Sequence, residues 1–284
     1  MTIDRSETKK FTAQDIAAVA TRSSSIQEIC LSGDLCLPPS WVFPHLQKLS
    51  GENVSEDLLE AVAVSLEQGQ LSELRVLDLE PHIFQESLVV QRLCSAIIHG
   101  PPTLRLQKFR LPSDTGDPAL FSSLLRCPAL SKVEELDLRA MYGDADEHSL
   151  ADAFHGGVFR HHLHTLRVNL GRYRDDAPSV RFFRALNCGA YSSLRVLEVH
   201  TSYRFEDFGA LSKFFTPRLG IETLKLGKIE VEGAEGLCEA LESGALPRLK
   251  KVTTQHQRMK RDAVERLIKC LRNQKVTKNL MGRA

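Results

Sequence analysis

The chain has 284 residues, of which 42% are hydrophobic and 26% charged, and its formal net charge is +1. This balance is typical of a globular protein, and the length allows one large domain, two small ones or one repeat array. No apolar run approaches the length of a transmembrane helix, and the charged start, MTIDRSETKKFTAQDI, lacks the apolar core of a secretory signal. We therefore expect no membrane partner and read the start as mature sequence.

The seven cysteines give little indication of covalent cross-linking. Their number is odd, and no two of them have C-x-x-C spacing. A disulfide framework and a zinc knuckle are therefore both disfavoured. We expect reduced thiols that pack as small apolar residues in an intracellular protein, with the cytoplasm as the predicted compartment and the nucleus as the alternative.

In chain order, residues 1–25 are predicted to form a capping helix that covers the first strand. From residue 26 onward one pattern recurs, an L-x-x-L-x-L frame in which other aliphatic residues or Phe replace some leucines. Complete frames begin at Ile26, Leu74, Leu106, Val133, Leu163, Leu194 and Ile221, and shortened frames begin at Leu46 and Leu249. Nine frames at intervals of 20 to 32 residues indicate a repeat protein.

Segments with helical periodicity follow the frames. In 232–243, EGAEGLCEALES, apolar residues recur at spacings of three and four, and Gly244 stands where a helix usually ends. The other predicted helices are 55–69, 85–100, 117–127, 177–189, 205–215 and 261–271. Ser55, Asp117 and Asp262 are candidate first-turn or N-cap residues.

One strand and one helix thus form a unit that cannot bury its apolar side alone, so neighbouring units must stack. Parallel strands lie about 4.8 Å apart, whereas packed helices need roughly 8–10 Å. A stack with strands on one side and helices on the other must therefore bend, with the sheet inside. We predict an α/β solenoid of about nine repeats, shaped as a horseshoe with a concave strand face and a convex helix face.

The sequence resembles the leucine-rich repeat superfamily, and within it the ribonuclease-inhibitor-like type with long, helix-containing repeats. The best match is IETLKLGKIEVEGAEGLCEAL (221–241), where Gly233, Gly236 and the helix fall as that type requires. The resemblance implies a leucine-rich-repeat domain over 26–272, and we expect the basic residues 273–284 that follow it to form a flexible tail. The Asn or Cys that the family usually has at the ninth repeat position is missing, so we expect irregular turns.

Charged side chains fill the position between the second and third apolar residues of six consecutive frames. In chain order they alternate in sign: Asp78, Arg110, Asp137, Arg167, Glu198 and Lys225. Neighbours of opposite charge attract across a sheet, so one interpretation is a self-neutralising ladder, each exposed pair contributing about 0–1 kcal/mol. The other is a docking strip for a protein partner, which is compatible with the first. The flanking positions of this strip include Glu80, Lys108, Glu135, Arg139 and His200.

Exposed aromatic residues are expected in loops near the ends of the central repeats, at Tyr142, Tyr173, Tyr191 and Tyr203. The segments 139–147 and 171–177 are polar and long enough to be recognition loops, which makes Tyr142 and Tyr173 candidate partner-binding residues. The alternative, which we favour, is that these segments are solvated connections.

No motif for catalysis or cofactor binding is found. The segment 155–164, HGGVFRHHLH, holds four histidines, but two of them are adjacent in a loop and convergence on a metal is not specified. No Ser-His-Asp order, glycine-rich phosphate loop or H-E-x-x-H occurs. We therefore predict no enzymatic activity, no metal, no cofactor and no small-molecule substrate.

Residues 250–284 hold eleven Lys or Arg and two acidic residues. This segment could meet RNA, an acidic protein or an anionic membrane, but a soluble cap on the last repeat is the simpler interpretation. The sequence thus predicts a protein-interaction module that binds an unidentified protein through the concave face and rim loops. The alternatives are a GTPase regulator, as in the GTPase-activating members of the family, and a ribonucleoprotein component that uses the basic C-terminus.

Overall fold

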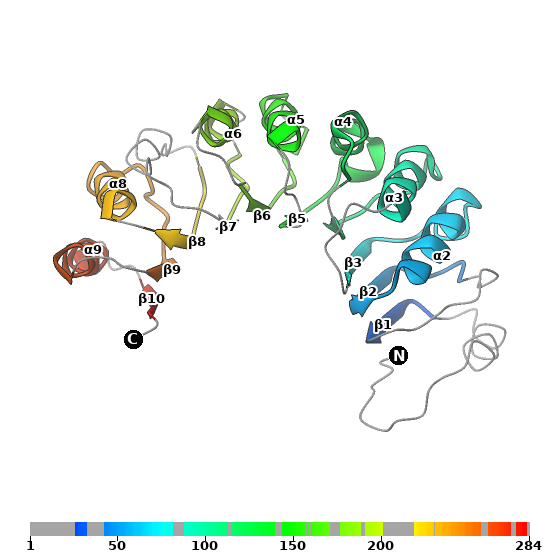
Figure 1. Cartoon of the computed structure of the whole chain (residues 1–284), viewed down its shortest axis with the longest axis horizontal. Coiled ribbons are helices and arrows are strands. Elements are labelled where there is room, and N and C mark those ends of the chain that lie inside the picture. The colour runs from blue at the N-terminus through cyan, green and yellow to red at the C-terminus, as the bar shows by residue number, and fades with distance from the viewer. Residues whose placement is uncertain are drawn as a thin grey trace, which may run out of the picture. The chain divides into compact units, whose positions relative to one another are not determined.

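The computed structural model divides the chain into two compact units, Met1–Leu136 and Asp137–Ala284. The described residues are 26–32, 43–81, 88–112, 115–139, 144–156, 158–159, 161–170, 177–188, 191–200, 219–229, 231–256, 261–273 and 277–282. The predicted capping helix at 1–25 and the predicted helix at 205–215 lie outside these ranges. In both units, strands and helices alternate along the chain (Figure 1).

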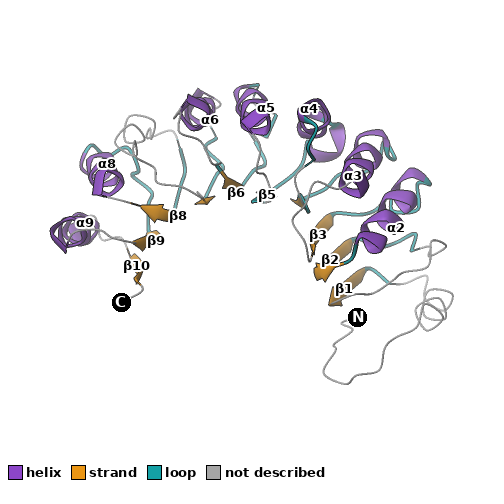
Figure 2. Cartoon of the chain, in the orientation of Figure 1, coloured by secondary structure: helices purple, strands orange, loops and turns teal. Residues whose placement is uncertain are grey.

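In the first unit, parallel strands are followed by helices that lie together on one side of them (Figure 2). The strands are β1 (Glu28–Ser32), β2 (Lys48–Val54), β3 (Val76–Pro81) and β4 (Lys108–Arg110); the helices are α2 (Glu56–Glu67), α3 (Leu88–His99) and α4 (Pro118–Arg126), with a 3-10 turn at Pro128–Leu130. Each strand from β1 to β4 pairs in parallel with the next along the chain. The division between the units falls within β5 (Glu135–Leu138).

The second unit repeats this arrangement. Its strands are β6 (Thr165–Asn169), β7 (Val196–His200), β8 (Thr223–Ile229), β9 (Lys251–His256) and β10 (Thr277–Gly282); its described helices are α5 (Asp144–His155), α6 (Ala177–Cys188), α8 (Val231–Glu242) and α9 (Arg261–Asn273). From β6 to β10 each strand again pairs in parallel with the next. The predicted α/β alternation of a repeat solenoid is confirmed, whereas the horseshoe and the number of repeats stay predictions.

The apolar residues of the frames form the core between strands and helices. Leu74, Leu77 and Leu79 of one frame are all buried. Leu77 pairs with Leu49 of β2 on one side and Phe109 of β4 on the other, so equivalent frame positions stack from strand to strand. The frame therefore fixes both the strand and its register, because a shift by one residue would turn the apolar side chains away from the helices.

Capping residues stabilise the ends of several helices. The Ser55 side chain accepts a hydrogen bond from the Leu58 amide, and Asp117 accepts from the amides of residues 119 and 120 at the start of α4. These contacts satisfy amides that have no partner within the helix. Gly244, two residues after α8, has a φ of 72°, the left-handed conformation that favours glycine.

The structure differs from the sequence-based predictions at three places. Residues 144–147 belong to α5 and not to the predicted loop 139–147. Tyr191 is buried: its hydroxyl donates to the carbonyl oxygen of Phe154 at 2.8 Å, and the two rings pack 5.1 Å apart. The predicted flexible tail over 273–284 contains β10, which pairs with β9. None of the cysteine side chains that the structure describes is in a disulfide, and those of 94, 127, 238 and 270 are buried.

Candidate functional site

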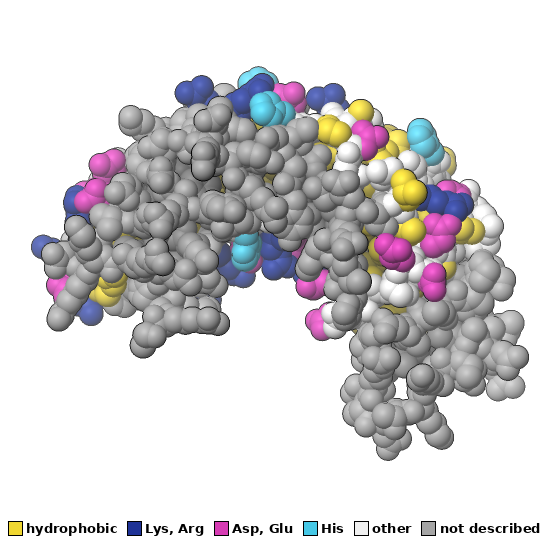
Figure 3. All heavy atoms as spheres, viewed as in Figure 1, with side chains coloured by type: hydrophobic (Ala, Val, Ile, Leu, Met, Phe, Trp, Pro, Cys, Tyr) yellow, Lys and Arg dark blue, Asp and Glu magenta, His cyan; other side chains and the backbone are white. Residues whose placement is uncertain are grey.

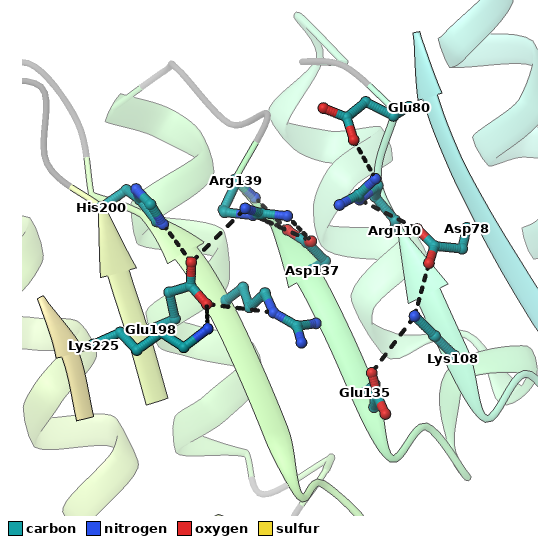
Figure 4. Close-up of polar contacts among 11 residues, drawn as sticks. Asp78, Glu80, Lys108, Arg110, Glu135, Asp137, Arg139, Glu198, His200 and Lys225 are labelled. Atoms are coloured by element: carbon teal, nitrogen blue, oxygen red, sulfur yellow. Dashed lines mark hydrogen bonds and ion pairs between the residues drawn. The ribbon is translucent and has the colours of Figure 1, made fainter. Parts of the chain in front are cut away.

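The charged residues of the predicted strip lie on the strands, alternating with the buried frame residues. We call the side of the strands away from the helices the strand face. In the first unit it carries the first-unit cluster, defined as Asp78, Glu80, Lys108, Arg110 and Glu135. In the second unit it carries the second-unit cluster, defined as Asp137, Arg139, Arg167, Glu198, His200 and Lys225. Figure 4 shows the side chains of both clusters as sticks, with dashed lines for the hydrogen bonds and ion pairs between them.

In the first-unit cluster each cation bridges two carboxylates (Figure 4). Lys108 Nζ lies 2.7 Å from Asp78 Oδ2 and 3.7 Å from Glu135 Oε2. Arg110 Nη1 donates to Glu80 Oε2 at 2.6 Å, and its Nε lies 3.3 Å from Asp78 Oδ1. The Glu80 and Glu135 side chains are 45% and 41% exposed, whereas Arg110 is 20% exposed. The outer layer of this cluster is therefore acidic.

The second-unit cluster is centred on the carboxylate of Glu198. His200 Nε2 lies 2.6 Å from its Oε1, and Lys225 Nζ lies 2.9 Å from its Oε2. Two arginines are more distant, with Arg167 Nε 3.5 Å from Oε2 and Arg139 Nη1 3.8 Å from Oε1. One carboxylate is thus shared by four basic side chains from β5, β6, β7 and β8 or their ends.

This arrangement controls the protonation of Glu198. The hydrogen bond from His200, followed by that from Lys225, lowers the pKa of Glu198 to about 2, although burial acts in the opposite direction. The carboxylate is therefore ionised at neutral pH and can only accept hydrogen bonds. It follows that His200 Nε2 carries the proton of the hydrogen bond it makes.

The second acid of this cluster, Asp137, forms an ion pair with Arg139. Arg139 donates from Nε to Asp137 Oδ1 at 3.0 Å and from Nη2 to Oδ2 at 2.7 Å, and its backbone amide lies 3.2 Å from Oδ1. This is the two-pronged geometry in which guanidinium and carboxylate pair most strongly. The Asp137 side chain is only 5% exposed, so its charge lies beneath the arginine.

A neutral side chain beside this cluster has an unmet hydrogen-bonding group. Asn169, on β6, is 7% exposed, and its amide oxygen Oδ1 has no hydrogen-bond partner. Its register partner is His200 on β7, and it follows Arg167 by two residues, so it shares the strand face with both. A buried acceptor without a donor costs about 1–3 kcal/mol, and a ligand with a donor could recover part of this.

The structure brings the predicted strip residues together within each unit. Glu198 is the register partner of Arg167 on one side and Lys225 on the other, as the alternation of charges predicts. The flanking residues Lys108, Arg139 and His200 join these ion pairs. Tyr142 and Tyr173 lie outside the described residues. The exposed fraction of each charged side chain was not predicted. Sequence spacing indicates which face of a strand a residue lies on, but not how far its neighbours cover it.

Other kinds of site find no support in the described residues. Among them, no group of three or more His, Cys, Asp or Glu side chains could hold a metal ion. No described helix has both the length and the apolar character needed to cross a bilayer.

The two units also differ in overall charge. Residues 1–136 contain 12 Lys and Arg and 18 Asp and Glu, a net charge of −6. Residues 137–284 contain 25 Lys and Arg and 18 Asp and Glu, a net charge of +7. The acidic outer layer of the first-unit cluster and the basic groups of the second-unit cluster thus follow the sign of their units.

Comparisons with known proteins do not assign the chain to a family. No protein-family model matches it, and no curated protein matches it. Among solved structures it is similar to the crystal structure of a protein from Bacteroides fragilis, with 11% sequence identity and a TM-score of 0.48. That match covers 95% of this chain and 72% of the other. The likeness is too distant to support an argument about function.

Proposed function

We propose that this protein is a non-catalytic protein-interaction module that binds a macromolecular partner through its strand face. The observation that carries this proposal is the pair of charged clusters on consecutive parallel strands. Their side chains are held in place by ion pairs, so a partner would meet a preorganised pattern of charge with a reduced entropic cost of ordering it.

The repeat architecture supports this role. Stacked strand and helix units present an extended surface whose residues can change without disturbing the buried frame. We further propose that the repeats are of the leucine-rich type and form a horseshoe whose concave side is the strand face. Charge complementarity of this kind contributes mainly specificity and association rate.

Affinity capture of the full chain from its own cells, at low and high salt, tests the proposal. One strand-face variant combines Glu80→Lys and Glu135→Lys in the first-unit cluster, and another carries Lys225→Glu in the second. The matched control carries Arg181→Glu and Glu235→Lys, two exposed ion-pairing positions on α6 and α8. All variants are first checked by circular dichroism and thermal unfolding.

We expect a protein partner that the control retains and at least one strand-face variant loses. A partner lost only in the control would place binding on the helices. Partners that neither strand-face variant affects would likewise contradict the proposal.

A further inference from the structure

The second-unit cluster has its acids inside and its bases outside. The side chains of Glu198 and Asp137 are 10% and 5% exposed, whereas those of Lys225 and His200 are 41% and 44% exposed. The carboxylates are covered by the basic groups that they orient. A partner approaching this face therefore meets guanidinium, ammonium and imidazole groups first.

The charges do not cancel within this cluster. Three permanent cations, Arg139, Arg167 and Lys225, face two carboxylates. The excess positive charge belongs to a unit whose net charge is +7. Because Arg167 and Lys225 both contact Glu198, one of them can pair with a further anion while the other keeps its contact with the carboxylate. The cluster thus favours an anionic ligand, by local geometry and by the field of the whole unit.

Asn169 indicates that the anionic ligand also carries a hydrogen-bond donor. Its buried Oδ1 accepts hydrogen bonds and has no partner. A fully ionised phosphate or carboxylate has no hydrogen to donate to it. A polypeptide has both groups that this surface needs, carboxylate side chains for the cations and backbone amides for the asparagine.

The described strand face offers no platform for stacked bases. Proteins that bind single-stranded nucleic acid usually combine basic residues with aromatic side chains. Among the described residues of β6, β7, β8 and β9, none is Phe, Tyr or Trp. This observation favours an acidic polypeptide over RNA.

We propose that the strand face of the second unit binds an acidic, extended polypeptide segment. Carboxylates of the segment pair with the exposed cations of the cluster, chiefly Arg139 and Lys225, and an amide of the segment donates to Asn169 Oδ1. The inference rests on the proposed function and names the chemistry of its partner. The first-unit cluster, with carboxylates in its outer layer, does not bind the same segment.

Fluorescence anisotropy with the full-length protein tests this directly. The probe is a labelled twelve-residue peptide of alternating Glu and Gly. The comparison peptide has Gln in place of Glu, and a labelled twelve-nucleotide RNA is the third probe. The protein variants are Lys225→Gln in the second-unit cluster and Lys108→Gln in the first. These two lysines are matched, since each lies on the strand face and pairs with carboxylates.

We expect the acidic peptide to bind at least about tenfold more tightly than the glutamine peptide, with an affinity that falls as salt rises. Lys225→Gln should weaken this binding roughly fivefold or more, whereas Lys108→Gln should leave it within about twofold. Asn169→Ala should weaken binding of the peptide but not of free polyphosphate, since only the peptide has an amide donor. Thermal unfolding confirms that each variant is folded.

Equal binding of the acidic and glutamine peptides would overturn the inference, as would equal effects of the two lysine variants. Tighter binding of RNA that is lost in Lys225→Gln would make this face a nucleic-acid site and would also overturn it. If the peptide does not bind while affinity capture still finds a partner that depends on the strand face, the inference fails and the proposed function stands. If no captured partner depends on the strand face, the proposed function itself fails.

Discussion

Glu198 shows how one carboxylate can organise a charged surface. It is nearly buried, yet hydrogen bonds from His200 and Lys225 keep it ionised. Because the carboxylate offers two oxygens, it can fix several cations at once. The residue thus holds the basic groups at their positions while contributing little charge to the surface itself.

The lowered pKa of Glu198 predicts a pH dependence of stability. Its folded-state pKa of about 2 lies below the ordinary value of 4.5, so the unfolded chain binds the proton first as pH falls. The stabilisation is therefore complete above pH 4.5 and is lost as pH decreases toward 2. The free energy of unfolding of Glu198→Gln should be lower than that of the wild type at pH 6, and this difference should shrink by about 2 kcal/mol between pH 6 and pH 3.

Urea unfolding of both proteins across this range measures the difference, and the comparison cancels the titration of all other carboxylates. A difference that stays constant from pH 6 to pH 3 would contradict the ion-pair arrangement around Glu198.

The sequence could predict which residues share the strand face but not how deeply each lies. Glu198 lies within a frame and Glu80 directly follows one, and both were predicted as partner-binding residues, yet Glu198 is covered by cations and Glu80 is not. Tyr191 was expected in an exposed loop. Its ring is instead buried against Phe154, a contact with a residue 37 positions earlier that local sequence cannot reveal.

At the scale of elements, the regularly spaced apolar residues of the frame predicted where the strands lie. The last strand, β10, was not predicted from this pattern. Lys278 of β10 is the register partner of Val252, a buried frame residue of β9, so the equivalent frame position is polar and the pattern is broken. The helix α5 was not among the predicted helices, because its periodic apolar residues start only at Leu150.

The pairing of β10 with β9 makes a prediction about the C-terminal segment. Removing residues 274–284 should leave β9 without a neighbour on that side and expose its backbone groups. We expect faster amide hydrogen exchange in β9 and a lower melting temperature, with β6 unaffected. Hydrogen exchange followed by mass spectrometry measures the exchange in β9 and β6, and thermal unfolding gives the melting temperature. Unaltered exchange in β9 would show that 277–282 does not pair as described.

At the scale of the whole molecule, the two units carry opposite net charges and opposite layering of charge on their strand faces. The first unit, at −6, places carboxylates outermost, and the second, at +7, places bases outermost. In the space-filling view, basic and histidine side chains are visible at one stretch of the strand side and acidic side chains at another (Figure 3). A protein with two such faces can distinguish partners by the sign of their charge, since like charges repel at an interface.

The measurement that tests this layering most directly is carbodiimide labelling of carboxylates in the native protein, read out by peptide mass spectrometry. The account predicts fast labelling of Glu80 and Glu135 and labelling of Asp137 and Glu198 that is slower by about tenfold or more, since the latter pair is covered and held ionised by basic groups. Labelling in urea should remove the difference and serves as the control. Equal native labelling of the two pairs would contradict the opposite charge layering, and with it the inferred acidic partner of the second unit.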